Sequence, residues 1–181
     1  MAYESIIAKG GLSTESHYPY KGKDGACIFD SSKTPAAAIL TGYTNIPTNA
    51  YDELIEALYT EGPISVSVDA SNWWRYSKGV YDGCNTSKPD VDHAVLLVGY
   101  GVDAKLGAYW TIRNSWGPSW GENGHIRIKR TLAGEYCGWD TTPADGTGCD
   151  GGPDKVYVCG MCGILYDNTY PNVASKVEII E

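Results

Sequence analysis

The chain has 181 residues and a formal net charge of −8, from 22 acidic residues against 14 lysines and arginines. This balance argues against a nucleic-acid or anionic-membrane partner, because no basic stripe is present to displace counterions from a polyanion. Hydrophobic residues make up 43% and charged residues 20%, which is unlike a disordered or fibrous chain. No apolar run is long enough to span a membrane, and no signal-peptide pattern is visible. The composition therefore predicts an acidic globular protein.

The six cysteines indicate where such a protein would reside. They are too few for a disulfide scaffold and too many for an ordinary reduced protein, which favours an oxidising compartment. Asn85-Thr86-Ser87 is an acceptor sequence for N-glycosylation and points the same way. We therefore expect a lysosome-like, vacuole-like or extracellular location. The missing signal peptide conflicts with this unless Met1 is not the true start of the protein.

The elements predicted along the chain pass from helices to strands. Residues 2–10 have a rough apolar helical face that ends at two glycines. A second helix is expected with Thr48 and Asn49 as its N-terminal cap, ending before a Gly-Pro pair. Apolar alternation and apolar runs then predict strands at 64–68, 93–100, 109–113 and 124–129. This order favours an α+β protein with a closed or nearly closed antiparallel sheet.

The last third of the chain is less regular. Residues 133–160 are rich in Gly, Asp and Cys and have no apolar periodicity, so they predict a long insertion. The tail over residues 173–181 is expected to be frayed or docked at an edge of the sheet. The tryptophans at 73, 74 and 120 are expected to be packing residues.

Two places combine a reactive polar side chain with the end of a strand. His93 begins one predicted strand, and Asn114 follows another. A histidine whose Nδ1–H is held by an amide oxygen keeps one tautomer and presents Nε2 to a nucleophile. A neighbouring indole, here Trp116, shields that hydrogen bond from water. These are the parts of a Cys-His-Asn site, although singly His93 is also compatible with a structural role and Asn-Ser-Trp-Gly with a turn.

Longer runs around these residues resemble the papain/cathepsin family of cysteine peptidases. The similar segments are Val91-Asp92-His93-Ala94-Val95, Gly99-Tyr100-Gly101, Arg113-Asn114-Ser115-Trp116-Gly117, Trp120-Gly121-Glu122-Asn123-Gly124, Gly62-Pro63-Ile64-Ser65-Val66, Cys162-Gly163-Ile164 and Tyr170-Pro171. The resemblance implies a papain-like α+β fold. Its expected parts are a remnant of the helical domain over residues 1–45, an antiparallel β-barrel domain over residues 46–172, and the tail.

The same resemblance implies that the nucleophilic cysteine is missing from this chain. In the family it lies roughly 130–150 residues before the histidine, so the matching position would precede Met1. Cys159-Gly160-Met161-Cys162 looks similar to the run around that nucleophile but follows the histidine, which is the wrong order. We therefore expect the C-terminal part of a peptidase, inactive by itself.

Further positions take expected roles from the family. The cysteine that matches Cys84 pairs there with the one that matches Cys162. Ser67 and Ala94 match positions that line the S2 pocket, and Asp167 matches its floor. An acid there could neutralise a basic P2 side chain, and a solvent-facing Asp167 is the alternative. The pairing of the other cysteines, at 27, 137, 149 and 159, stays open.

The function expected from the resemblance is a cysteine endopeptidase. His93 would be its general base and acid, Asn114 would orient His93, and Trp116 and Ser115 would support the pair. No metal or organic cofactor is implied, and the expected partners are a peptide or protein substrate and the upstream helical half of the same enzyme. The alternative is a non-catalytic module of the same fold that binds peptides or a partner protein.

Overall fold

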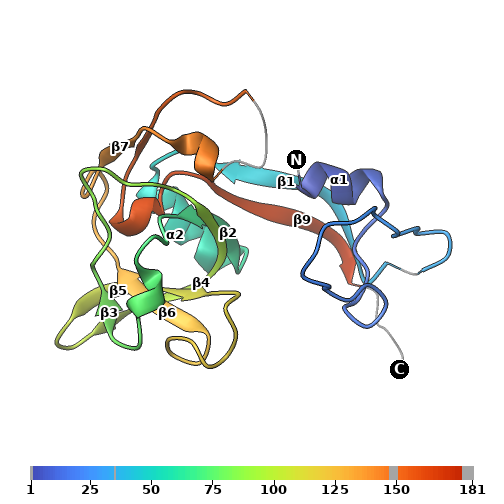
Figure 1. Cartoon of the computed structure of the whole chain (residues 1–181), viewed down its shortest axis with the longest axis horizontal. Coiled ribbons are helices and arrows are strands. Elements are labelled where there is room, and N and C mark those ends of the chain that lie inside the picture. Colours follow the sequence, from blue (N-terminus) through green and yellow to red (C-terminus); the bar gives the residue numbers. More distant parts are fainter. Residues whose placement is uncertain (1, 35, 147–150, 177–181) are drawn as a thin grey trace. The chain divides into compact units, whose positions relative to one another are not determined.

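The computed structural model describes residues 2–34, 36–146 and 151–176. The chain divides into two compact units: residues 1–44 with 171–181, and residues 45–170. Figure 1 labels the helices and strands in chain order. Within the described residues, no helix is long and apolar enough to cross a membrane. The predicted split into a helical-domain remnant over residues 1–45 and a barrel domain over 46–172 stays a prediction.

The first unit contains a short helix and a strand. Helix α1 spans Ala2–Ala8, and the backbone turns away at two positive-φ glycines, as the sequence predicted. A Cβ on Gly11 would lie 2.5 Å from the Ala38 carbonyl oxygen, so only glycine fits there. Ala38 begins strand β1 (Ala38–Ile46), and Thr41 Oγ1 of this strand donates a 3.1 Å hydrogen bond to the Asn172 carbonyl in strand β9 (Asn168–Lys176).

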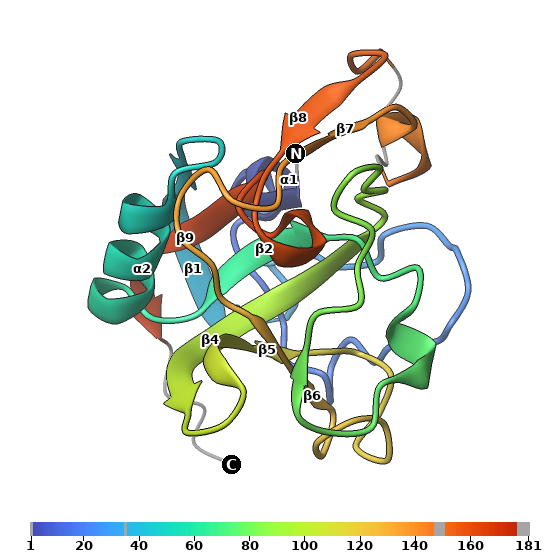
Figure 2. The ribbon, with the colours of Figure 1, turned by 90° about the vertical axis from the view of Figure 1, so that its left-hand side faces the viewer.

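The second unit is built around a mixed sheet (Figure 2). Its strands are β2 (Ile64–Val68), β3 (Val80–Tyr81), β4 (His93–Asp103), β5 (Gly107–Arg113), β6 (His125–Lys129) and the first residues of β9. Their order is β9-β2-β4-β5-β6-β3. The α+β class is confirmed, and so are the four predicted strands. The sheet is not closed into a barrel, and the two-residue strand β3 pairs parallel with β6, unlike the expected antiparallel closure.

The core lies between this sheet and helix α2 (Tyr51–Thr60). Burial alternates along β2, with Ile64, Val66 and Val68 inside, as period-two patterning requires. The predicted cap of α2 is wrong: Ala50 holds the N-cap position, with no side-chain cap bond. Asn49 instead has φ 61° and uses its amide to bind the chain near residues 157–159.

The predicted insertion contains regular structure that its sequence does not reveal. Strands β7 (Gly138–Asp140) and β8 (Val156–Val158) form an antiparallel hairpin. A disulfide between Cys137 and Cys159 closes the hairpin at its base. Three short 3₁₀ turns complete the unit, η1 (Trp73–Arg75), η2 (Pro143–Asp145) and η3 (Met161–Gly163). Residues 173–176 of the predicted tail continue β9, and residues 177–181 lie outside the described residues.

Candidate active site

His93 and Asn114 come together at one end of the sheet. His93 is the first residue of β4, paired with Val68 of β2, and Asn114 directly follows β5. His93 Nε2 lies 2.9 Å from Asn114 Oδ1. Asn114 is buried, its backbone N–H donates to the Gly124 carbonyl, and its Oδ1 also accepts the Ser115 N–H at 2.8 Å. The backbone bond to Gly124 and the Ser115 N–H therefore fix the Asn114 amide with its oxygen toward the imidazole.

The expected orientation of the imidazole is reversed in the structure. Because Asn114 Oδ1 can only accept, the proton of neutral His93 sits on Nε2. Nδ1 is then the nitrogen that keeps a free lone pair, whereas the sequence argument assigned that role to Nε2.

Aromatic rings surround His93. The Trp116 ring stacks on the imidazole with 5.4 Å between centroids and an interplanar angle of 28°. Buried Trp73 meets it edge-on at 6.3 Å, and Trp120 contacts the rings of both Trp116 and Trp73. Trp73 and Trp120 therefore pack as expected and also enclose the site, a role that sequence spacing could not reveal. Trp74 departs from the packing prediction, because it is 64% exposed beneath the Arg75 guanidinium.

An ion pair fixes the loop that carries Asn114 and Trp116. Arg127 of β6 donates two 2.8 Å hydrogen bonds to the Glu122 carboxylate, which also accepts the Gly79 N–H. These contacts, the Arg127 hydrogen bond above all, hold the pKa of Glu122 below its usual value. Glu122 thereby ties the loop between β5 and β6, residues 114–124, to Arg127 of β6. Asn114, at one end of this loop, is hydrogen-bonded to Gly124 at the other end.

The three positions matched to an S2 pocket also come together. Ser67 of β2 is the register partner of Ala94, and its Oγ donates a 2.9 Å hydrogen bond to Asp167 Oδ2. Asp167 is exposed, so its second carboxylate oxygen is open to solvent. Ser67 and Asp167 line a cavity of about 890 Å³ whose opposite wall comes from the insertion.

The cysteines divide into bonded and free. The Cys84–Cys162 disulfide has the pairing that the resemblance implied. The second disulfide engages Cys159, so neither cysteine of the Cys159-to-Cys162 run is a free thiol. Cys27 is free and exposed, and Cys149 lies outside the described residues.

Two further sequence predictions concern the surface. Asn85, the glycosylation candidate, is exposed, and its Oδ1 accepts hydrogen bonds from the backbone and hydroxyl of Ser87. Within the part of the chain that the structure describes, no group of three or more His, Cys, Asp or Glu side chains is arranged to hold a metal ion.

Comparisons with known proteins place this chain in a family. The family model described as "Papain family cysteine protease" matches residues 1–147. Vignain from Phaseolus vulgaris is 45% identical over 136 residues, 73% of this chain and 36% of the relative. A cathepsin L-like protein from Caenorhabditis elegans is 44% identical over 139 residues, 76% of this chain and 40% of the relative. The chain thus spans well under half the length of these relatives.

Solved structures give the same result at the level of the fold. The bromelain protease from Ananas comosus, solved with the E64 inhibitor, superposes with a TM-score of 0.72 at 35% identity. That match covers 94% of this chain and 67% of bromelain. The chain belongs to the papain family of cysteine proteases.

Proposed function

We propose that this chain supplies the histidine and asparagine of a cysteine endopeptidase whose nucleophilic cysteine lies outside residues 1–181. The observation that carries the proposal is the 2.9 Å hydrogen bond between His93 Nε2 and Asn114 Oδ1 beneath the Trp116 ring. It leaves Nδ1 free to exchange a proton with a thiol. A neutral amide orients the ring without adding a charge to a thiolate–imidazolium pair.

The reaction follows from these roles. The thiolate attacks the substrate carbonyl carbon, and His93 gives its proton to the departing amine as the peptide C–N bond breaks. The product is a thioester between enzyme and acyl group. Neutral His93 then takes a proton from the water that attacks the thioester carbonyl carbon. The C–S bond breaks, the acid product and the thiolate are released, and the restored imidazolium again pairs with the thiolate. Asn114 keeps the ring aimed throughout, and Trp116 keeps water from the Asn114 contact.

The cysteines of this chain support its proposed inactivity when alone. Four of the six are held in disulfides. Cys27 is free, and its thiol pKa is lowered chiefly by a backbone hydrogen bond from Phe29, not by an imidazole, while Cys149 lies outside the described residues. The purified 181-residue chain should therefore hydrolyse no peptide, and thiol-sensitive hydrolysis by it would contradict this assignment.

The proposed substrate is a peptide with an apolar or basic side chain at P2. Ser67 and Ala94 leave room for an apolar group, and Asp167 adds a carboxylate at the pocket. Ser67 occupies one Asp167 oxygen, so the other remains for a guanidinium or ammonium. We place the complete enzyme in a lysosome-like or vacuole-like compartment or outside the cell, which the two disulfides support.

The alternative is a non-catalytic binding module. Such a module would need the cavity beside Ser67 but not an aligned His93–Asn114 pair. Peptide hydrolysis by the complete protein, compared with its His93→Ala variant, separates the two. The peptidase assignment predicts a loss of kcat on the order of 10³-fold or more. Binding of peptides without turnover in either protein would support the module instead.

A further inference from the structure

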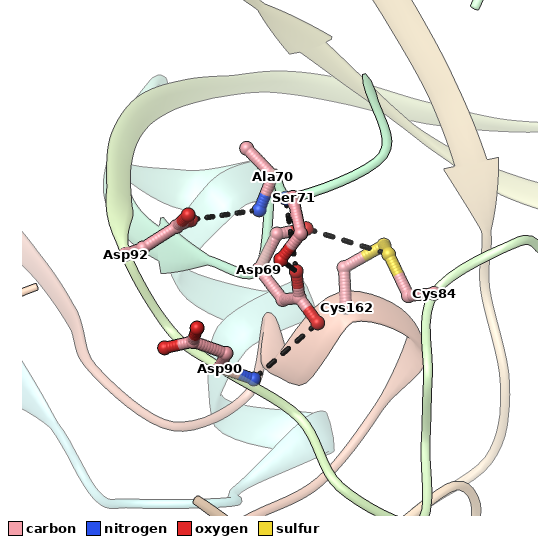
Figure 3. Close-up of a disulfide and its surroundings, with 7 residues drawn as sticks. All are labelled: Asp69, Ala70, Ser71, Cys84, Asp90, Asp92 and Cys162. Carbon is pink, nitrogen blue, oxygen red and sulfur yellow. Dashed lines mark hydrogen bonds between the residues drawn. A yellow bond between two sulfur atoms is a disulfide. The ribbon is translucent and has the colours of Figure 1, made fainter. Parts of the chain in front are cut away.

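The three residues before His93, which lead into β4, are held by hydrogen bonds to residues from elsewhere in the unit. Each backbone N–H of residues 90–92 has an acceptor. These acceptors are Asp69 Oδ2 at 3.3 Å for residue 90, Asp140 Oδ2 at 3.0 Å for residue 91, and the Val68 carbonyl at 3.1 Å for residue 92. Figure 3 shows Asp69 beside the Cys84–Cys162 disulfide, with its carboxylate bound by the Asp90 N–H, and Asp92 accepting the Ala70 N–H. Among these three acceptors, only Asp140 belongs to the insertion. The N–H that it accepts is that of Val91, two residues before His93.

Asp140 is a fully buried carboxylate, with 0% of its surface exposed. Its Oδ2 accepts the Val91 N–H, and its Oδ1 accepts the Thr142 N–H at 2.8 Å. No lysine or arginine pairs with it among the described residues. Burying a carboxylate costs free energy unless hydrogen bonds compensate it. The hydrogen bonds from the Val91 and Thr142 N–H groups are therefore tightly constrained.

Apolar and steric contacts from the insertion reach the same residue. The Val91 side chain packs in a small buried cluster with Val156 and Val158 of β8. A Cβ on Gly146 would collide with the Val91 carbonyl oxygen, so the backbone of the insertion lies directly against it. Val91 is thus contacted by the insertion through its N–H, its carbonyl and its side chain.

The insertion is itself anchored to the body of the unit. The Cys137–Cys159 disulfide closes its base. Asn49, just before α2, donates from Nδ2 to the Tyr157 carbonyl and accepts the Cys159 N–H, each at 2.9 Å. The hairpin therefore presents Asp140 to Val91 from a fixed position.

We propose that the insertion is a positioning device for His93 and that Asp140 is its positioning residue, an inference that rests on the proposed peptidase function. Asp140 does not touch the reacting atoms. It fixes the backbone that enters β4, and thereby the alignment of the imidazole with Asn114. Shifts of about 1 Å in a catalytic group cost about 100-fold in rate, so a loosened entry segment lowers kcat.

The charged neighbours of Asp90 in this segment are acidic. Asp69 directly follows β2, Asp92 directly precedes β4, and Asp90 accepts a 3.4 Å hydrogen bond from the Thr142 hydroxyl of the insertion. Burial above all, followed by the charges of these neighbours and Asp140, raises the pKa of Asp90. The carboxylates around residues 90–92 therefore repel one another, and the hydrogen bonds of this segment must offset that repulsion.

The test compares two isosteric variants of the complete protein, Asp140→Asn and Glu135→Gln. Each removes one negative charge from the insertion, but only Asp140 is buried against Val91, whereas Glu135 is exposed and does not line the cavity beside Ser67. An asparagine at 140 has one acceptor oxygen for two N–H groups. We expect faster amide exchange at Val91, loss of the Asn114-bonded Nε2–H signal of His93 in NMR spectra, and a fall in kcat of at least 10-fold with KM changed less than 3-fold.

Glu135→Gln should leave all three readouts as in the parent protein. A folded Asp140→Asn protein with unchanged His93 signal would overturn the proposal, whether or not the protein is a peptidase. If Asp140→Asn does not fold, hydrogen exchange in the parent protein decides. The Val91 amide, the amides of the β7–β8 hairpin and the His93 Nε2–H should then open as one unit, and independent opening of the His93 proton would refute the role.

Discussion

At the scale of single residues, the pair of His93 and Asn114 carries the proposed chemistry. A buried amide whose oxygen accepts both the imidazole and the Ser115 N–H has one orientation available. Its Nδ2 has no hydrogen-bond partner among the described residues, so the oxygen contacts alone fix it. The hydrogen bond to Asn114 then fixes the orientation of the His93 ring.

Replacing Asn114 with alanine should therefore lower kcat more than it raises KM. We expect a fall in kcat on the order of 100-fold, because the imidazole loses its orientation. Steady-state kinetics on the complete protein measure both constants, and Asn85→Gln, an exposed amide of the same unit, is the control. An Asn114→Ala enzyme with the kcat of the parent would remove Asn114 from the mechanism.

Asp167 should determine the response to a charged P2 side chain. In Asp167→Asn, kcat/KM for a peptide with Arg at P2 should fall about 10-fold, the equivalent of about 1.4 kcal/mol. The same peptide with Leu at P2 is the internal control and should change less than 2-fold. If the parent enzyme does not cleave peptides with Arg at P2 at any acidic to neutral pH, Asp167 has no role in P2 recognition and only faces solvent.

At the scale of elements, the sequence predicts strands β2, β4, β5 and β6, and it misses the nine-residue strands β1 and β9 as well as the short β7 and β8. Strand β2 shows strict alternation, and β4 begins at His93 as expected. In contrast, β7 and β8 have three residues each, and the inward position of β7 is Asp140, an acid where alternation calls for an apolar residue. Hydrogen bonds and a disulfide, not periodicity, make that hairpin, and such partners cannot be read from a single sequence.

The two disulfides should differ in their effect on stability. Removing Cys137–Cys159, which closes 22 residues, should lower the free energy of unfolding by about 3 kcal/mol, and removing Cys84–Cys162, which closes 78, by about 4–5 kcal/mol. Urea unfolding of the two double-serine variants measures both values. The reverse order would show that strain or burial, not loop closure, dominates.

The loop that carries Asn114 should loosen in acid through Glu122. Because the folded pKa of Glu122 lies below its ordinary 4.5, its contribution is full above that value and is lost as pH falls through the folded pKa. Glu122→Gln should cost about 1–2 kcal/mol at pH 7 and flatten the dependence of stability on pH below 4.5. Urea unfolding at several pH values, with exposed Glu56→Gln as control, checks this; parallel curves for Glu122→Gln and the parent would contradict it.

At the scale of the whole molecule, motifs that the sequence shares with one family predicted the fold class, which is confirmed, and the roles of the site residues, which stay predictions. The sequence did not predict the open sheet, the imidazole orientation or the contacts of the insertion with Val91. Each depends on register or on partners that lie far apart in the chain. The chain spans 36 to 40% of the relatives compared with it, and its proposed activity requires a thiol from beyond its own residues.

The most direct test of that requirement is to find the reactive thiol. The complete protein would be labelled with a peptide epoxide that alkylates active-site cysteines, and the label would be located by mass spectrometry of the digested protein. The account predicts one labelled cysteine outside residues 1–181, with the labelling abolished by His93→Ala. A label on Cys27 or Cys149 that depends on His93 would contradict it and place the nucleophile within this chain.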